Sequence, residues 1–355
     1  MATSGTVGQT VFSSQMLIDH VCRRCSIVPQ QITAETIQTI LDLLHLQLSA
    51  LSSASNPLWT IDEVILPVYE NQRSVLLPVG SVDVMSLNLR QVTRLSGTYT
   101  SSEGTAANAF DADTTTACTQ TTQAGNIAMQ LTSAALVDTL GIRANATGTW
   151  SVSLQGSEDG ITYTTLFTNA ALSAVSGEWY WVDVEEMTTH TYFRLLANGT
   201  TVLDVAELVF ANSPQDIPMY KMNMDDYSNL PNKNSSGRPT QFWYDKQAAG
   251  QGVQNVVTVW PLPSSSYITY QYSGYVKKLI QDVGTMAQEI EVPQQWLEAI
   301  ICGVARKACR EIKEADKSLI PLLDADWDRE SKISWSNESD GSPVKLMPNF
   351  RAYTA

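Results

Sequence analysis

Residues 91–213 differ in composition from both flanking parts of the chain, and this break constrains the fold more than any other feature. The segment contains three Arg and no Lys against 12 Asp and Glu, a net charge of −9, and it is rich in Thr and Gly. Its apolar residues come in short runs without the 3.6-residue period of an amphipathic helix. An all-β segment is therefore predicted to interrupt a chain whose two flanks are each incomplete.

Seven apolar runs in this segment are candidate strands, separated by turn-forming clusters such as Ala146–Gly148 and Glu158–Gly160. The runs are Ala128–Leu131, Thr139–Ala144, Trp150–Gly156, Thr162–Phe167, Trp179–Val184, Tyr192–Leu196 and Ala206–Phe210. Many short strands at such spacing are typical of a two-layer β-sandwich, in which each strand hides one face.

The N-terminal flank begins with two helical patterns. Ser13 or Ser14 is a suitable cap for a helix through about Cys25, and Thr33 for a second helix. The second helix has an apolar face at the spacing i, i+3, i+4, i+7, made of Ile37, Ile40, Leu41, Leu44, Leu48 and Leu51. The stretch that follows, up to about Arg90, is predicted to form strands broken by turns.

The C-terminal flank returns to a mixed pattern. Strands are predicted at Thr240–Tyr244, Val256–Pro261 and Tyr267–Tyr275, and a helix opens at Pro293, a residue suited to the first turn. Cations gather near the end of this helix, where they favour the helix dipole: Arg306, Lys307, Arg310 and Lys313. Beyond Lys332 the chain becomes a polar, Ser-rich tail.

These patterns predict an α+β multidomain protein. A mixed helical and β hub is expected from residues 1–90 and 214–340, an inserted all-β jelly-roll sandwich at 91–213, and an extended C-terminal tail at 341–355. The tail is too short to bury its own apolar residues, so we expect these to dock on another subunit: Leu346, Met347, Phe350 and Tyr353.

The sequence contains no arrangement typical of an enzyme. It has no GxSxG, Walker loop or GxGxxG, and its three His residues are scattered. Cys22 and Cys25 form a CxxC without the second pair that a structural zinc site needs, so two small side chains one helical turn apart are the simpler interpretation. We expect a non-catalytic protein.

Charge, hydropathy and cysteine usage limit the environment and the partners. The net charge of −14 argues against a general nucleic-acid binder. The four cations of the last helix could meet DNA phosphates, or could form a solvated face paired with Glu311, Glu314 and Asp316. There is no run of about 18 apolar residues, so we expect no membrane span. An odd number of irregularly spaced Cys, five, indicates synthesis in a reducing cytoplasm.

Four pieces of the acidic segment, in chain order, resemble the discoidin or coagulation-factor C-type module, a galactose-binding-like jelly roll. The pieces are NAFDADTTTACTQ (108–120), SEDGITYTTLF (157–167), TYFRLL (191–196) and VAELVF (205–210). Cys118 stands where that family usually has Trp, and Ala112 where Gly is common.

The resemblance implies a structural calcium ion as cofactor. Its ligands would be Asp111, Asp113, Thr116 and Glu207, through side-chain or carbonyl oxygens of the kind that calcium prefers. The alternative is that Asp111 and Asp113 only form Asx turns.

The flanks resemble head-to-tail adaptor (connector) proteins of short-tailed bacteriophages, which normally lack such an insertion. The resemblance rests on DDYSNLPNKNSSGRPTQFWYD (225–245), VVTVWPLPSSSYITYQYSGYVKKL (256–279) and EVPQQWLEAIICGVARKAC (291–309). It implies a virion structural protein at the portal–tail junction, made in the host cytoplasm. Such a protein forms a ring, commonly of twelve copies, that extends the DNA channel.

The partners implied are the portal protein, tail or nozzle proteins, further copies of the chain and, transiently and without specificity, genomic DNA, but no membrane. The four tail residues would dock on the portal, and the four cations of the last helix would contact DNA or the portal. The alternative function is that of a carbohydrate-binding protein recognising host surface glycans, with the jelly roll as its lectin part.

Overall fold

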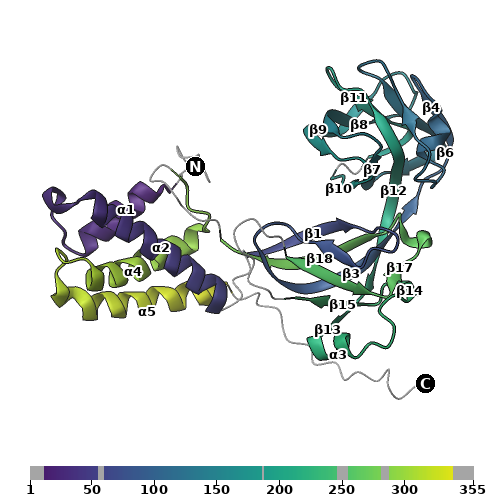
Figure 1. Ribbon diagram of the computed structural model, residues 1–355. Helices are drawn as coiled ribbons and strands as arrows, with labels where there is room; N and C mark the ends of the chain where they lie inside the picture. The colour runs from purple at the N-terminus through teal and green to yellow at the C-terminus, as the bar shows by residue number, and fades with distance from the viewer. Residues whose placement is uncertain (1–11, 55–59, 186–187, 246–254, 281–287, 339–355) are drawn as a thin grey trace. The chain divides into compact units, whose positions relative to one another are not determined.

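A computed structural model describes residues 12–54, 60–185, 188–245, 255–280 and 288–338 (Figure 1). The chain divides into two compact units. One unit combines Met1–Ile61 with Lys278–Ala355 and is helical, and the other is Asp62–Lys277 and is built of strands.

The helical unit is formed by helices from both ends of the chain. They are α1 (Ser14–Arg24), α2 (Ala34–Ala54), α4 (Gln294–Glu311) and α5 (Ile320–Asn337), with short 3₁₀ turns η1 (Pro29–Gln31) and η5 (Lys317–Leu319). The predicted caps are present, since Ser13 Oγ accepts from the backbone of Met16 and Thr33 Oγ1 from that of Thr36. The apolar faces share one core that includes Leu17, Ile40, Leu44 and Ile300.

Helix α5 was not predicted, because its Ser and charged residues hide the apolar stripe that packs on α4. It continues past Lys332 to Asn337, where the sequence indicates a polar tail. Two contacts explain the continuation. Trp335 packs edge-to-face on Trp296 with ring centroids 4.7 Å apart, and Ser334 Oγ donates to the carbonyl of Gln295 at 3.0 Å.

The strand unit contains four sheets within the described residues. The strand bounds are β1 Ile61–Pro67, β2 Ser74–Leu76, β3 Ser81–Arg94, β4 Thr98–Ser101, β5 Cys118–Thr119, β6 Asn126–Leu136, β7 Thr139–Ala144, β8 Gly148–Ser157, β9 Thr164–Ala174, β10 Trp179–Asp183, β11 Thr189–Ala197, β12 Asp204–Pro218, β13 Tyr220–Met222, β14 Ser236–Gly237, β15 Gln241–Tyr244, β16 Val256–Trp260, β17 Leu262–Pro263 and β18 Gln271–Lys278. Short helices are η3 (Ala106–Ala109), α3 (Met224–Ser228) and η4 (Ser265–Tyr267).

The largest sheet has the order β1-β18-β3-β12-β7-β10, with β5 also paired to β12, and the second has the order β4-β6-β11-β8-β9. The part β12-β7-β10 and the second sheet bury one core together, to which Ile142 and Phe210 contribute from one layer and Leu154 and Phe193 from the other. The predicted two-layer sandwich is therefore present, and β7 matches its predicted run residue for residue. The described part of the chain mixes helices with sheets that are mainly antiparallel, the pairs β13–β15 and β14–β17 being parallel.

Strands β3 and β12 cross the predicted boundaries at 90/91 and 213/214. They pair from Ala211 opposite Arg94 to Pro218 opposite Asn88, so strands of the sandwich and of the hub share one sheet. The chain accordingly divides at the helices, and not at the ends of the acidic segment. The amino-acid composition and the charge change at these two predicted boundaries, but the backbone hydrogen bonds between β3 and β12 continue across both of them.

The hub strands bury a core of their own. Val68, Leu87, Phe242 and Tyr272 are among its buried residues. The described helices include none that combines the length and the hydropathy needed to cross a membrane.

Candidate functional site

The loop after η3 brings together three of the four residues predicted to hold calcium. Thr116 Oγ1 lies 2.9 Å from Asp111 Oδ2, 3.0 Å from the carbonyl oxygen of Asp113 and 3.3 Å from that of Asn108. Four oxygens of different chemistry therefore face one another. Calcium takes six to eight oxygen ligands of these kinds, namely carboxylate, carbonyl and hydroxyl groups.

The fourth predicted residue, Glu207, lies on β12 and reaches the same place. Its side chain is fully buried, its Oε2 lies 3.5 Å from Arg94 Nη2, and its Oε1 has no hydrogen-bond partner. The side chain of Asp111 and the backbone of Ala112 lie near the Glu207 carboxylate. Burial, with the nearby carboxylate of Asp111, raises the pKa of Glu207 from its ordinary value of 4.5 to about 8. A buried carboxylate in this position needs a proton or a cation.

The structure contains the two Asx turns that the sequence offers as the alternative to calcium binding. Asp111 Oδ1 accepts from the backbone of Asp113, and Asp113 Oδ1 from that of Thr115, each at 2.9 Å, so the two Asx turns are formed. Ala112 has φ 61°, in the left-handed region that glycine adopts more readily than alanine.

The donor set fits calcium. It consists of two carboxylates, Asp111 and Glu207, with the hydroxyl of Thr116 and two backbone carbonyls, while the Asp113 side chain is used in its turn. In the described ranges no three His, Cys, Asp or Glu side chains gather at one point, so the fit depends on neutral oxygens. The sequence analysis did not identify Asn108, which contributes only its backbone carbonyl, or Arg94, which lies beside Glu207 from another strand. Neither kind of contact produces a sequence motif.

A second candidate site is the outer face of the five-stranded sheet. On β11, Phe193 and Leu195 point into the core, so Tyr192 and Arg194 point outward. Gln130 on β6 donates to Tyr192 Oη at 3.0 Å. Arg194 Nε donates to Gln155 Oε1 on β8 at 2.8 Å. Amide, phenol and guanidinium groups therefore form two hydrogen-bonded pairs across three neighbouring strands.

Two further side chains extend this group toward the sheet edge. Gln155 Nε2 donates to Thr165 Oγ1 on β9 at 3.2 Å. The guanidinium carbon of Arg194 lies 3.7 Å from the ring centroid of Tyr163. We call Gln130, Gln155, Tyr163, Tyr192 and Arg194 the sheet-face row. It was not predicted, because its members are brought together only by the strand register.

The sheet that carries this row is free of acidic residues. None of β4, β6, β8, β9 and β11 contains an Asp or a Glu, although the segment around them has a net charge of −9. This absence is visible in the sequence once the strands are assigned, and it is the signal that could have identified the face.

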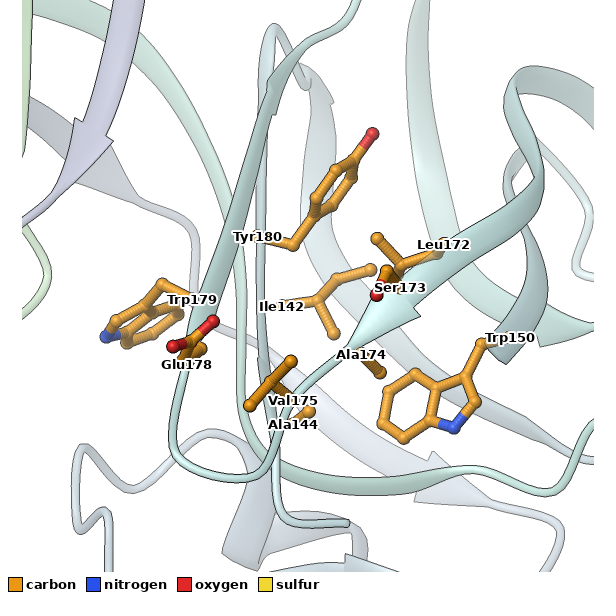
Figure 2. A pocket seen from close by; sticks show the side chains of 10 residues that line it. All are labelled: Ile142, Ala144, Trp150, Leu172, Ser173, Ala174, Val175, Glu178, Trp179 and Tyr180. Atoms are coloured by element: carbon orange, nitrogen blue, oxygen red, sulfur yellow. The ribbon is translucent and has the colours of Figure 1, made fainter. Parts of the chain in front are cut away.

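The sandwich also contains a small cavity between its layers (Figure 2). Its volume is about 50 Å³, and Figure 2 shows Ile142 and Ala174 between Tyr180 and Trp150. Usual small-molecule pockets hold roughly 300–1,000 Å³, so this cavity is too small for such a ligand.

A wider hollow of about 520 Å³ lies on the hub strands. It is lined by Lys221, Met222, Asn223, Met224, Trp243, Tyr244 and Asp245. Beside it the rings of Tyr227 and Trp243 stack with centroids 4.9 Å apart.

Two of the four cations near the end of α4, Arg306 and Arg310, contact α5. Arg310 Nη2 donates to both carboxylate oxygens of Asp324, at 2.8 and 2.7 Å. The guanidinium of Arg306 lies 5.0 Å from the ring centroid of Trp327. Burial and the neighbouring Arg306 lower the pKa of Lys307. Lys313 is exposed. The acidic partner of Arg310 is thus Asp324, and not one of the three residues expected from the sequence.

The CxxC cysteines are buried in the helical core. Cys25 Sγ donates to the carbonyl of Ala305 at 3.3 Å, and burial raises the pKa of its thiol to about 12. The predicted docking residues Leu346, Met347, Phe350 and Tyr353 lie outside the described residues.

Comparisons with known proteins bear on the sandwich. No protein-family model and no curated protein sequence matches the chain. Among solved structures, a CBM32 module of AlyQ in complex with 4,5-unsaturated mannuronic acid is 15% identical, covers 35% of this chain and 99% of its own, and has a TM-score of 0.30.

Two further structures are similar to the same extent. Chitosan-binding module 1 from a chitosanase/glucanase of Paenibacillus sp. IK-5 is 20% identical over 35% of this chain and 99% of its own, with a TM-score of 0.30. CBM62 from Clostridium thermocellum Xyl5A is 23% identical over 35% and 97%, with a TM-score of 0.29. Because these identities and TM-scores are low, the fold of the sandwich rests on its strand pairing.

Proposed function

We propose that the chain is a non-catalytic protein whose sandwich binds glycans through the sheet-face row. One observation carries the proposal: Tyr192 and three planar polar groups lie on a sheet whose strands contain no acidic residue, and Tyr163 lies beside them just before β9. Sugar rings present C–H faces that pack on aromatic rings, and hydroxyls that exchange hydrogen bonds with amide and guanidinium groups. The proposal rests on this face and not on the structural neighbours.

Calcium has a supporting role in this proposal. Asp111, Thr116 and Glu207, with the carbonyls of Asn108 and Asp113, would hold the ion, which would supply positive charge to a buried carboxylate. Glu207 belongs to β12 and Asp111 to the loop, so these two side chains would fix the loop to the strand. The sheet-face row lies on the other sheet, so the ion has no direct contact with a sugar there.

A glycan array with the full chain tests this function. We expect binding to at least one glycan class with a dissociation constant of about 1 mM or tighter. The variant Tyr192→Ala should lose most of that binding, because it removes both a ring and the hydroxyl that pairs with Gln130. Tyr220→Ala is the matched control, since Tyr220 is 73% exposed and lies on hub strand β13. Absence of binding across the array would refute the function.

The head-to-tail adaptor remains a second proposal, favoured by the construction of the helical unit. Helices from both chain ends pack on one core, and α5 ends at Asn337 immediately before the tail that carries the proposed docking residues. A segment that follows a packed helix can be presented to a partner and ordered on binding. The glycan-binding sandwich would then belong to a virion component.

Electron microscopy of the chain mixed with a candidate portal protein tests the second proposal. We expect ring-shaped particles that contain both proteins, and fewer of them when the residues after Asp340 are deleted. Full assembly by the truncated chain would refute the docking role of the tail.

A further inference from the structure

We propose that Arg194 selects glycans that carry a carboxylate, such as uronic or sialic acids, over neutral glycans. This inference rests on the proposed function and assigns the ligand class of the same sheet face. A guanidinium offers a planar fork of donors that matches a carboxylate, which neutral sugars lack.

The guanidinium of Arg194 is held in place, yet its terminal nitrogens have no anionic partner. Its Nε donates to Gln155 at 2.8 Å, and its plane lies against the ring of Tyr163. Among the residues that the structure describes, no carboxylate forms an ion pair with it, and none of its nitrogens is buried without a partner. The side chain is therefore oriented before a ligand arrives, and the terminal nitrogens remain available.

The other two arginines of the acidic segment are differently placed. Arg94 lies beside the buried carboxylate of Glu207 at 3.5 Å. Arg143 also has Glu207 near it, on the adjacent strand, and its Nε is buried. All three arginines are half-buried, but Arg194 lies on a sheet whose strands contain no acidic residue and has no ion pair among the described residues.

The two acidic residues next to the sheet face contact groups other than Arg194. Glu158 Oε1 lies 3.3 Å from the ring of His190. Asp159 Oδ1 accepts from the backbones of Ile161 and Thr162, each at 2.8 Å. Both belong to the turn between β8 and β9. An anionic ligand at Arg194 would thus contact the guanidinium directly, while the two carboxylates of the adjacent turn oppose it without pairing with Arg194.

The remaining acidic residues of the segment oppose an anionic ligand at longer range. At physiological ionic strength the screening length is about 8 Å, so distant acidic residues act weakly on a ligand in contact with Arg194. Because the favourable contact is also ionic, binding should weaken as salt is added.

The first test compares two forms of one oligosaccharide with the full chain. Oligogalacturonate and its methyl ester share the same sugars and differ in charge. We expect the acid form to bind roughly ten- to a hundredfold more tightly, the range for hydrogen bonds to a charged group. The same comparison with mannuronate and sialic acid oligomers extends the test to other acidic glycans. This test needs no variant, so a folding defect cannot obscure it.

The second test changes the arginine. Arg194→Gln should lower affinity for the preferred acidic glycan roughly ten- to a hundredfold and affinity for neutral glycans by much less, so that the preference for the acidic glycan falls. Arg194→Lys should fall between, because it keeps the charge but loses the planar fork. Circular dichroism of each variant checks its fold.

The outcomes separate the inference from the function it rests on. Equal affinity for acid and ester forms, or unchanged affinity in Arg194→Gln, would overturn the selection role while glycan binding stands. If the chain binds neither acidic nor neutral glycans, both the function and the inference are wrong.

Discussion

The buried carboxylate of Glu207 should make the stability of the calcium-free sandwich depend on pH in an unusual direction. In the folded chain this group keeps its proton up to about pH 8, whereas in the unfolded chain it loses the proton near its ordinary value of 4.5. Between these values the folded state binds the additional proton. The free energy of unfolding therefore falls as pH rises through this window, and it levels off above the higher value.

The magnitude follows from the two values. Each pH unit of the window is worth about 1.4 kcal/mol, so the loss between pH 4.5 and about 8 has an upper limit of roughly 4 to 5 kcal/mol. Glu207→Gln keeps the shape and cannot ionise, so this part of the pH dependence should vanish. Calcium should restore the wild-type stability at the alkaline end, because it replaces the proton.

The assay is urea unfolding followed by tryptophan fluorescence, since the sandwich contains Trp150, Trp179 and Trp181. Wild type and Glu207→Gln are compared across the window with a chelator and with calcium. Glu178→Gln is the matched control, because Glu178 is an exposed carboxylate beside β10. Identical pH dependence in wild type and Glu207→Gln would refute the assignment of the effect to this group.

Further predictions concern the loop, the ion and the helical core. Ala112→Gly should raise the free energy of unfolding by up to about 1 kcal/mol, because Ala112 adopts φ 61°, and a loss of stability in the same urea assay would contradict this. Calcium binding should release a proton from Glu207 below about pH 8, so the affinity for calcium should rise up to about tenfold per pH unit in that range. Calorimetry in buffers of different ionisation heat measures this proton release, and a binding heat that is the same in every buffer would exclude it. Trp296→Ala should lower helical-unit stability by about 3–5 kcal/mol, since Trp296 is 1% exposed, whereas Leu322→Ala, at a 58% exposed position on α5, should change little.

The strands of the sandwich could be predicted because each apolar run ends at a turn cluster. Thr139–Ala144 is the clearest example. Helix α5 could not, since its stability comes from contacts such as Trp335 on Trp296, which belong to another helix. The predicted ends of the insertion followed charge, and charge does not record that β3 and β12 continue to pair.

The two candidate sites differ in how far sequence could reach them. The calcium residues were named from a family resemblance, and the structure adds the unpartnered Oε1 of Glu207 and the carbonyl of Asn108. The sheet-face row has no motif at all. Tyr192 and Gln155 come from strands whose pairing only the fold defines, so register had to be known first.

Amide hydrogen exchange of the full chain, with and without its best-bound glycan, tests the central claim most directly. The account predicts slower exchange on β8 and β11, at Gln155 and at Tyr192 to Arg194, with the hub strands unchanged. Slower exchange confined to the loop at Asp111 to Thr116, or to hub residues, would place the glycan elsewhere and contradict the account.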